Sequence, residues 1–191
     1  MSRFLSKASE SLLPYTPGEQ PQGRKFIKLN TNECPYPPSP KVAEAILAGY
    51  EENSSKIMPL ELANLRLYSD PEERVLIEAI ADHYGVGTNQ VIAGNGSDEI
   101  LGFAFRAFCD QNAPLQFADL TYGFYPALCG LYGIPFKVVP LEEDFTLNIE
   151  PYKNCGNNVI IANPNAPTGM NLPLSAIEEV AASNPDRVVM V

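Results

Sequence analysis

The sequence has few basic residues, with 13 lysines and arginines against 23 aspartates and glutamates and a formal net charge of −10. This balance argues against a general nucleic-acid-binding protein, which presents a basic face. No apolar run approaches the ~20 residues of a membrane-spanning helix, and the N-terminus lacks the apolar core of a secretory signal peptide. We therefore expect neither a nucleic-acid partner nor a membrane partner.

The sequence also lacks any close cysteine pair. Its four cysteines are widely spaced and form no C-x-x-C motif: Cys34, Cys109, Cys129 and Cys155. This spacing favours reduced thiols in a cytoplasmic protein over a disulfide or zinc framework. The single histidine, His83, has no pairing partner near it in the sequence, and the acidic run Glu142–Asp144 is typical of a solvated loop. No metal site is predicted.

What the chain does contain is enough apolar sequence for a substantial core, with 45% hydrophobic residues in 191. Residues 1–38 are rich in proline and predict an extended N-terminal arm, with a short strand at residues 27–29. Residues 39–66 predict a connecting helix region or small domain, in which a helix capped by Ser39 ends at Gly49. Residues 67–191 predict one larger domain.

The larger domain begins with a predicted helix that Asp70 caps, Pro71 starts and Gly85 ends. After it, short apolar runs alternate with helical patterns. The expected strands are residues 91–93, 115–117, 136–139, 158–162 and 187–191, and the expected helices are residues 97–109, 123–132 and 174–182. Such alternation predicts an α/β fold, with a mostly parallel, doubly wound sheet covered by helices on both faces.

One turn in this domain has the properties of a phosphate site. Residues 92–101 read I-A-G-N-G-S-D-E-I-L, an apolar run that enters two glycines before a helix opens. Glycines leave backbone amides uncovered, and a helix N-terminus offers unpaired N–H groups and positive potential. A dinucleotide fingerprint would need glycine at Glu99. A nucleotide-binding P-loop would need a lysine, and none lies between Lys56 and Lys137.

Three turns are predicted to meet at one edge of the sheet, because ligands of such sheets bind beyond the carboxyl ends of the strands. They are residues 94–99, residues 119–123 (D-L-T-Y-G) and residues 163–169 (N-P-N-A-P-T-G). A phosphate cradle, an aromatic side chain and an asparagine-rich turn together suit a flat, phosphorylated ring that forms hydrogen bonds.

These residues resemble a known family. Residues 163–169 are similar to the N-P-N-x-P-T-G turn of the fold-type I aminotransferases, which use pyridoxal 5′-phosphate (PLP), and residues 93–99 are similar to their phosphate-binding turn. Three further strings narrow the resemblance to the histidinol-phosphate aminotransferase family of histidine biosynthesis: residues 13–18 (L-P-Y-T-P-G), 29–35 (L-N-T-N-E-C-P) and 68–71 (Y-S-D-P). The motifs run in family order from about residue 11 to the end.

The resemblance implies roles for individual residues. The positions matching Gly96, Ser97 and Asp98 bind the PLP phosphate, and the aromatic matching Tyr122 stacks on the pyridine ring. The tyrosine matching Tyr68 reaches the PLP of the other subunit, which implies a homodimer with Tyr68 and the arm near its interface. On the arm, Tyr15 and Asn32 are the implied contacts of a phosphorylated amino substrate.

The sequence departs from the family at Ala166. The family has there an asparagine that donates a hydrogen bond to the phenolic oxygen of the cofactor, and an alanine side chain cannot donate one. Asn165 is the substitute that we expect, with Asn163 as a further candidate and an asparagine that serves only its own turn as the alternative.

A second departure is that no lysine of the chain matches the family's Schiff-base motif, so no catalytic residue is assigned. In the family this lysine follows the strand matching residues 188–191. The chain therefore resembles the N-terminal portion of an aminotransferase, truncated before that lysine, and we expect residues 1–191 alone to be inactive. Two alternatives stay open: a PLP-dependent threonine-phosphate decarboxylase, and a truncated, non-catalytic binding or dimerisation module.

Overall fold

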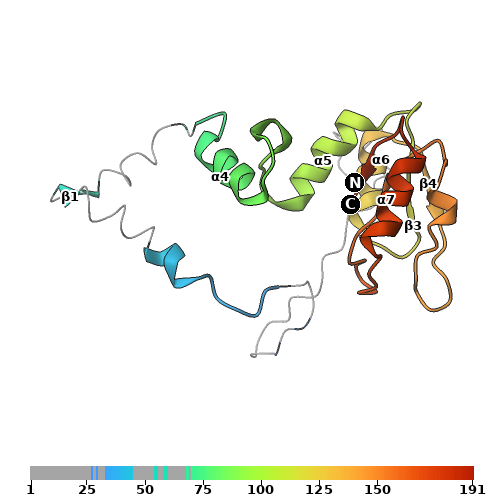
Figure 1. Cartoon of the computed structure of the whole chain (residues 1–191), viewed down its shortest axis with the longest axis horizontal. Coiled ribbons are helices and arrows are strands. Elements are labelled where there is room, and N and C mark those ends of the chain that lie inside the picture. Colours follow the sequence, from blue (N-terminus) through green and yellow to red (C-terminus); the bar gives the residue numbers. More distant parts are fainter. Residues whose placement is uncertain are drawn as a thin grey trace, which may run out of the picture. The chain divides into compact units, whose positions relative to one another are not determined.

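The structure is a computed structural model of the whole chain (Figure 1). It describes residues 27, 29, 33–44, 54–55, 58–59, 68 and 70–191. The chain divides into two compact units, which separate between Ala93 and Gly94. The candidate turns at residues 94–99, 119–123 and 163–169 all belong to the second of these units.

The unit that ends at Ala93 contains short elements. Residues 40–44 are helical, and the Ser39 hydroxyl accepts the Lys41 N–H at 3.3 Å, so the predicted helix start is confirmed. Residues 45–49 of that predicted helix lie outside the described residues. The strands β1 (Ser54–Ser55) and β2 (Met58–Pro59) pair in antiparallel fashion. Helix α4 (Arg74–Tyr84) and the 3₁₀ helix η1 (Thr88–Gln90) follow.

Helix α4 begins later than predicted. The Asp70 carboxylate accepts the N–H groups of Glu72 at 3.1 Å and Arg74 at 3.3 Å, so it closes a turn instead of capping a helix at Pro71. Glu73 then adopts a left-handed φ of 48°, which interrupts any helix before Arg74. The predicted end is confirmed, because Gly85 has a φ of 66° and donates its N–H to the last carbonyls.

Two predicted strands are wrong. Ile27 and Leu29 lie in no strand and are exposed. Residues 91–93 also lie in no strand, although the backbone of Val91 is extended at φ −120° and ψ 134°. An apolar run fixes which side chains seek burial, but a strand also needs a neighbour for its backbone hydrogen bonds. Residues 91–93 have no such neighbour in the described part of the chain.

The second unit is built on a four-stranded parallel sheet with the order β4-β3-β5-β6. Its strands are β3 (Leu115–Ala118), β4 (Phe136–Val139), β5 (Asn158–Ile160) and β6 (Val189–Met190). The helices are α5 (Gly96–Phe108), α6 (Phe124–Tyr132) and α7 (Leu174–Ser183), with a 3₁₀ helix η2 (Glu150–Tyr152) that the sequence pattern did not predict. These strands and helices confirm the alternation predicted after residue 94.

Helices cover both faces of this sheet, as the alternation of side chains along β5 shows. Ile160 packs in a core cluster with Phe105 of α5 and Leu128 of α6. Its neighbour Val159 faces the other way and packs with Val180 of α7 in a second cluster. Successive residues of a strand point to opposite faces, so two separate cores sandwich the sheet. The doubly wound α/β fold is confirmed.

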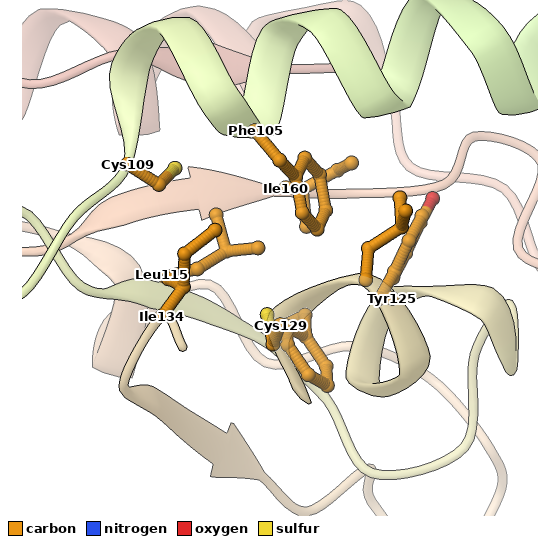
Figure 2. Packing of buried hydrophobic residues seen from close by; sticks show 9 residues of the cluster. Phe105, Cys109, Leu115, Tyr125, Cys129, Ile134 and Ile160 are labelled. Atoms are coloured by element: carbon orange, nitrogen blue, oxygen red, sulfur yellow. The ribbon is translucent and has the colours of Figure 1, made fainter. Parts of the chain in front are cut away.

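The first core is dense in aromatic and sulfur-containing side chains (Figure 2). Phe105 is fully buried, and its ring lies 6.1 Å from that of Tyr125. Burial raises the pKa of the Cys129 thiol from 9.0 to about 12, because the charged thiolate loses its hydration in this core. Among the helices that the structure describes, none is long and apolar enough to span a bilayer.

Candidate cofactor site

The first turn, residues 94–99, opens helix α5 with an exposed backbone. Gly94 is closely packed, because a Cβ there would lie 2.7 Å from the Ile100 Cδ1 atom and would require that side chain to move. Gly96 has a φ of 79°, which favours glycine, and a Cβ there would meet nothing within 4 Å. The glycines therefore let the chain bend sharply into the helix while the outer surface of the turn stays open.

Two amides of this turn have no acceptor among the residues that the structure describes. The Asn95 N–H donates to the Glu99 carboxylate at 2.7 Å, and the Gly96 N–H donates to the Gly94 carbonyl at 3.0 Å. Within the described part of the chain, the N–H groups of Ser97 and Asp98 have no hydrogen-bond partner. They lie in the first turn of a helix of 13 residues, where the dipole favours an anion.

The second turn, residues 119–123, places an aromatic ring beside the first. The Tyr122 hydroxyl donates to the Asp98 carboxylate at 2.7 Å, across 24 residues of sequence. The half-buried ring of Tyr122 meets that of Tyr125 edge-on, with centroids 5.6 Å apart. The turn itself is closed by Asp119, whose carboxylate accepts the N–H groups of Leu120 at 2.7 Å and Leu141 at 3.0 Å.

The third turn, residues 163–169, is fastened to the second by Asn165. The Thr121 hydroxyl donates to the Asn165 side-chain oxygen at 2.8 Å. The Asn165 amide donates to the Leu120 carbonyl at 2.9 Å and to the Thr168 hydroxyl at 3.0 Å. Hydrogen bonds thus connect all three turns in series, and the predicted convergence of these turns is observed.

Asn165 is buried, and its side-chain amide has already used both hydrogens. It has no hydrogen left for the phenolic oxygen of a cofactor in this structure, and its predicted ring contact stays a prediction. Asn163 donates to the Leu172 carbonyl at 3.2 Å and accepts the Leu172 N–H at 2.8 Å. Ala166 lies between them on the same turn and offers no donor.

The remaining predicted site residues lie away from these turns in the sequence. Tyr68 belongs to the other unit, and its side chain is fully exposed. Tyr15 and Asn32 lie outside the described residues. No group of three or more potential metal ligands occurs in the part of the chain that the structure describes.

Sequence reasoning missed Thr121 and Thr168, which complete the hydrogen bonding of Asn165. No local pattern marks Thr121, because its partner lies 44 residues away. An apolar pocket of about 230 Å³ on the third turn was also missed; its lining includes Leu141, Leu147, Ile161 and Leu172. Its lining is mostly apolar and contains no lysine or arginine, so it offers a phosphate no positive charge.

The cofactor fit can be judged from these contacts. Two unpartnered amides, an open glycine bend and an adjacent aromatic ring suit an anionic group attached to a flat ring. The same turns carry the carboxylates of Asp98, Glu99 and Asp119 and no lysine or arginine. The donor set therefore fits a phosphate, while the balancing positive charge has to come from elsewhere.

Comparison with known proteins identifies the class. Residues 24–191 match the family of class I and II aminotransferases, and the chain belongs to that family. It is 48% identical to the histidinol-phosphate aminotransferase of Pseudomonas putida (strain W619) over 191 residues, which is 100% of this chain and 52% of that protein. It is 50% identical to histidinol-phosphate aminotransferase 1 of Methylococcus capsulatus, of which it covers 50%.

Solved structures agree on the fold. The histidinol-phosphate aminotransferase from Sinorhizobium meliloti, in complex with pyridoxal-5′-phosphate, superposes with a TM-score of 0.77 at 22% identity and covers 99% of this chain and 50% of that one. The L-threonine-O-3-phosphate decarboxylase from Porphyromonas gingivalis superposes with a TM-score of 0.58 at 20% identity, covering 76% of this chain and 41% of that one. The chain spans about half the length of the curated relatives it matches.

Proposed function

We propose that the full-length protein, meaning the complete gene product that contains residues 1–191, transfers an amino group between histidinol phosphate and 2-oxoglutarate with bound PLP. The reverse direction uses imidazole-acetol phosphate and glutamate. The observation that carries the proposal is the Tyr122 hydroxyl on the Asp98 carboxylate at 2.7 Å, which sets an aromatic ring beside two unpartnered amides. The identity of 46–50% to relatives named histidinol-phosphate aminotransferase supports the substrate.

In this proposal the described residues bind and orient the cofactor. The N–H groups of Ser97 and Asp98 would hold its phosphate at the bend that Gly96 allows, and the Tyr122 ring would pack on its pyridine face. When bound, PLP would supply the electron sink for proton removal at the substrate Cα. Holding the phosphate and the ring at fixed points restricts how the reacting carbon presents itself to a base.

The base is proposed to come from outside the described residues. Their lysines are Lys41, Lys137 and Lys153, and none lies on the three turns. Lys153 donates to the Glu179 carboxylate at 2.7 Å, and hydrogen bonds to Glu150 and Glu179 raise the pKa of its amine. A raised pKa favours the charged amine, which is a poor nucleophile. Because no lysine among residues 1–191 matches the family's Schiff-base motif, we also propose that residues 1–191 do not transaminate alone.

The full site is proposed to need a second copy of the protein. Tyr68 has a fully exposed side chain in the unit that ends at Ala93, and it is proposed to reach the cofactor phosphate of the partner subunit. Tyr15 and Asn32 are proposed to contact the phosphorylated amino substrate from the arm. A homodimer in solution, with reduced PLP affinity for Tyr68→Phe, is the expected result.

The test is an assay of the full-length protein with histidinol phosphate and 2-oxoglutarate. We expect stoichiometric formation of glutamate. Tyr122→Phe keeps the ring and loses the hydrogen bond to Asp98, whereas Tyr122→Leu loses the ring as well. We expect Tyr122→Leu to weaken PLP binding more than Tyr122→Phe does. Carbon dioxide release from threonine phosphate, without glutamate formation from histidinol phosphate, would indicate the decarboxylase instead, and absence of PLP binding would contradict both enzymes.

The predicted inactivity of the isolated chain has its own test. Residues 1–191 are mixed with PLP and treated with borohydride, which fixes any imine to a lysine. We expect only scattered, substoichiometric labelling of surface lysines, and stoichiometric labelling of one particular lysine, found by mass spectrometry, would refute the proposal that the reactive lysine lies outside this chain.

A further inference from the structure

The side chain of Asn165 makes contacts that reach beyond its own turn. It is 7% exposed, and its bonds to the Thr121 hydroxyl at 2.8 Å and the Leu120 carbonyl at 2.9 Å cross to the second turn. Its own backbone is fixed as well, because the Asn165 N–H donates to the Met170 carbonyl at 2.8 Å. Asn165 thus ties the third turn by hydrogen bonds to Leu120 and Thr121, the two residues immediately before Tyr122.

The Tyr122 ring is consequently held at both ends. The backbone of Tyr122 follows residues 120–121 and leads into α6, where the Tyr125 N–H donates to the Tyr122 carbonyl at 3.2 Å. Its hydroxyl donates to Asp98 on the phosphate turn at 2.7 Å. Without the hydrogen bonds of Asn165, residues 120–121 would gain conformational freedom. The backbone would then no longer fix the orientation of the Tyr122 ring.

We propose that Asn165 is a positioning residue, which orients the Tyr122 ring for stacking on the cofactor through Thr121 and Leu120. This inference rests on the proposed function. It assigns Asn165 a role different from direct contact with the cofactor, because both hydrogens of its amide are committed within the protein. Ala166 has no side-chain donor, so the turn lacks the residue that the family uses for direct contact with the cofactor.

The first experiment measures PLP affinity in the full-length protein. Asn165→Ala is expected to raise the dissociation constant about tenfold, and Thr121→Val, which removes one hydrogen bond with little change of shape, about threefold. The visible circular dichroism of bound PLP, which reports the asymmetry of the ring environment, is expected to weaken in both variants. Unchanged affinity and unchanged dichroism in both would overturn the proposal.

The decisive comparison places Asn165→Ala in the Tyr122→Leu background. A residue that acts only through the ring has nothing to position once the ring is gone, so the further change in the dissociation constant is expected to stay below about twofold, much less than one hydrogen bond is worth. A full tenfold effect in that background would show direct contact between Asn165 and the cofactor and overturn the positioning role.

The matched control is Asn184→Ala. Asn184 is also buried and bonded through its side chain, to the Tyr152 and Val180 carbonyls, each at 2.8 Å. It follows α7 and precedes β6, which places it at the opposite edge of the parallel sheet from the three turns. We expect Asn184→Ala to destabilise the protein and leave the dichroism of bound PLP unchanged. Equal dichroism changes in both variants would reduce Asn165 to a general structural role.

The cofactor-free protein separates this inference from the proposed function. In urea unfolding, Thr121→Val and Asn165→Ala are expected to be non-additive, because each removes the same bond. Additive effects would overturn the positioning role of Asn165, even in a protein that binds PLP and transaminates. If the two variants are non-additive but the unmodified protein does not bind PLP, the proposed function is overturned instead. Asn165 would then hold Thr121 without orienting a ring for a cofactor.

Discussion

Gly96 offers a sharp test of the phosphate turn, because a substitution there changes the backbone strain without adding a steric clash. Its φ of 79° lies in the left-handed region, and a Cβ would meet nothing within 4 Å. Gly96→Ala therefore adds strain without a clash. The left-handed conformation costs an alanine roughly 1–2 kcal/mol, and the stiffer unfolded chain returns about 0.4–1 kcal/mol. We expect the free energy of unfolding to fall by about 1 kcal/mol.

Gly102 in the same helix is the matched control. It lies inside α5, and a Cβ there would meet the Tyr132 hydroxyl at 3.4 Å, an ordinary contact distance. Alanine is favoured over glycine in a helix interior by about 1 kcal/mol. Gly102→Ala is therefore expected to raise the free energy of unfolding by up to about 1 kcal/mol. The same chemical change, six residues apart, gives effects of opposite sign.

Urea unfolding of the full-length protein, followed by far-ultraviolet circular dichroism, measures both variants. The midpoints should move in opposite directions while the slope of the free energy against urea stays constant. A PLP titration adds the functional readout, in which we expect Gly96→Ala to weaken binding and Gly102→Ala to leave it unchanged. If Gly96→Ala were as stable as the unmodified protein and bound PLP equally well, the bend at Gly96 would not be what exposes the Ser97 and Asp98 amides.

Three further predictions concern the core. Phe105→Ala, at a fully buried site, should cost about 3–5 kcal/mol in urea unfolding, while Phe103→Ala, 52% exposed on the same helix, should cost far less. The pKa of Cys129 is raised from 9.0 to about 12, so the unfolded chain loses this proton first; stability should decline as pH rises from about 9 to 12, with a shallower decline in Cys129→Ala. Iodoacetamide at pH 8 should alkylate exposed Cys34 and spare buried Cys109 and Cys129 until urea unfolds the protein.

Local sequence signals predicted the second unit well because its elements are short apolar runs between clear stop residues. Residues 136–139 form β4, and Gly96 starts α5 within one residue of the expected position. The prediction fails where the outcome depends on a distant neighbour. Residues 91–93 have the composition of a strand but no partner strand among the described residues. The Asp70 carboxylate accepts the Glu72 N–H in a turn before α4 and does not cap the helix. Composition records burial preference, whereas pairing depends on the rest of the fold.

The site divides in the same way. The three turns could be located from glycines, an aromatic residue and asparagines in order along the chain. The bonds that join them could not, because Tyr122 reaches Asp98 across 24 residues and Thr121 reaches Asn165 across 44. Motif matching assigned Asn165 to the cofactor because of its place in the turn. Its three side-chain bonds join it to the second turn and to Thr168, and its contact with the cofactor stays a prediction.

The charges of the turns bear on how the proposed site would hold a phosphate. Asp98, Glu99 and Asp119 place negative charge on two of the three turns, and no lysine or arginine lies on any of them. A helix N-terminus supplies only about half an elementary charge, less than a phosphate of nearly two negative charges requires. Under the proposed function, these turns would fix the direction of the phosphate through hydrogen bonds, while cations from outside the three turns would supply the attraction. Orientation and attraction would then be separable properties, so a net charge of −10 is compatible with the proposed phosphate site.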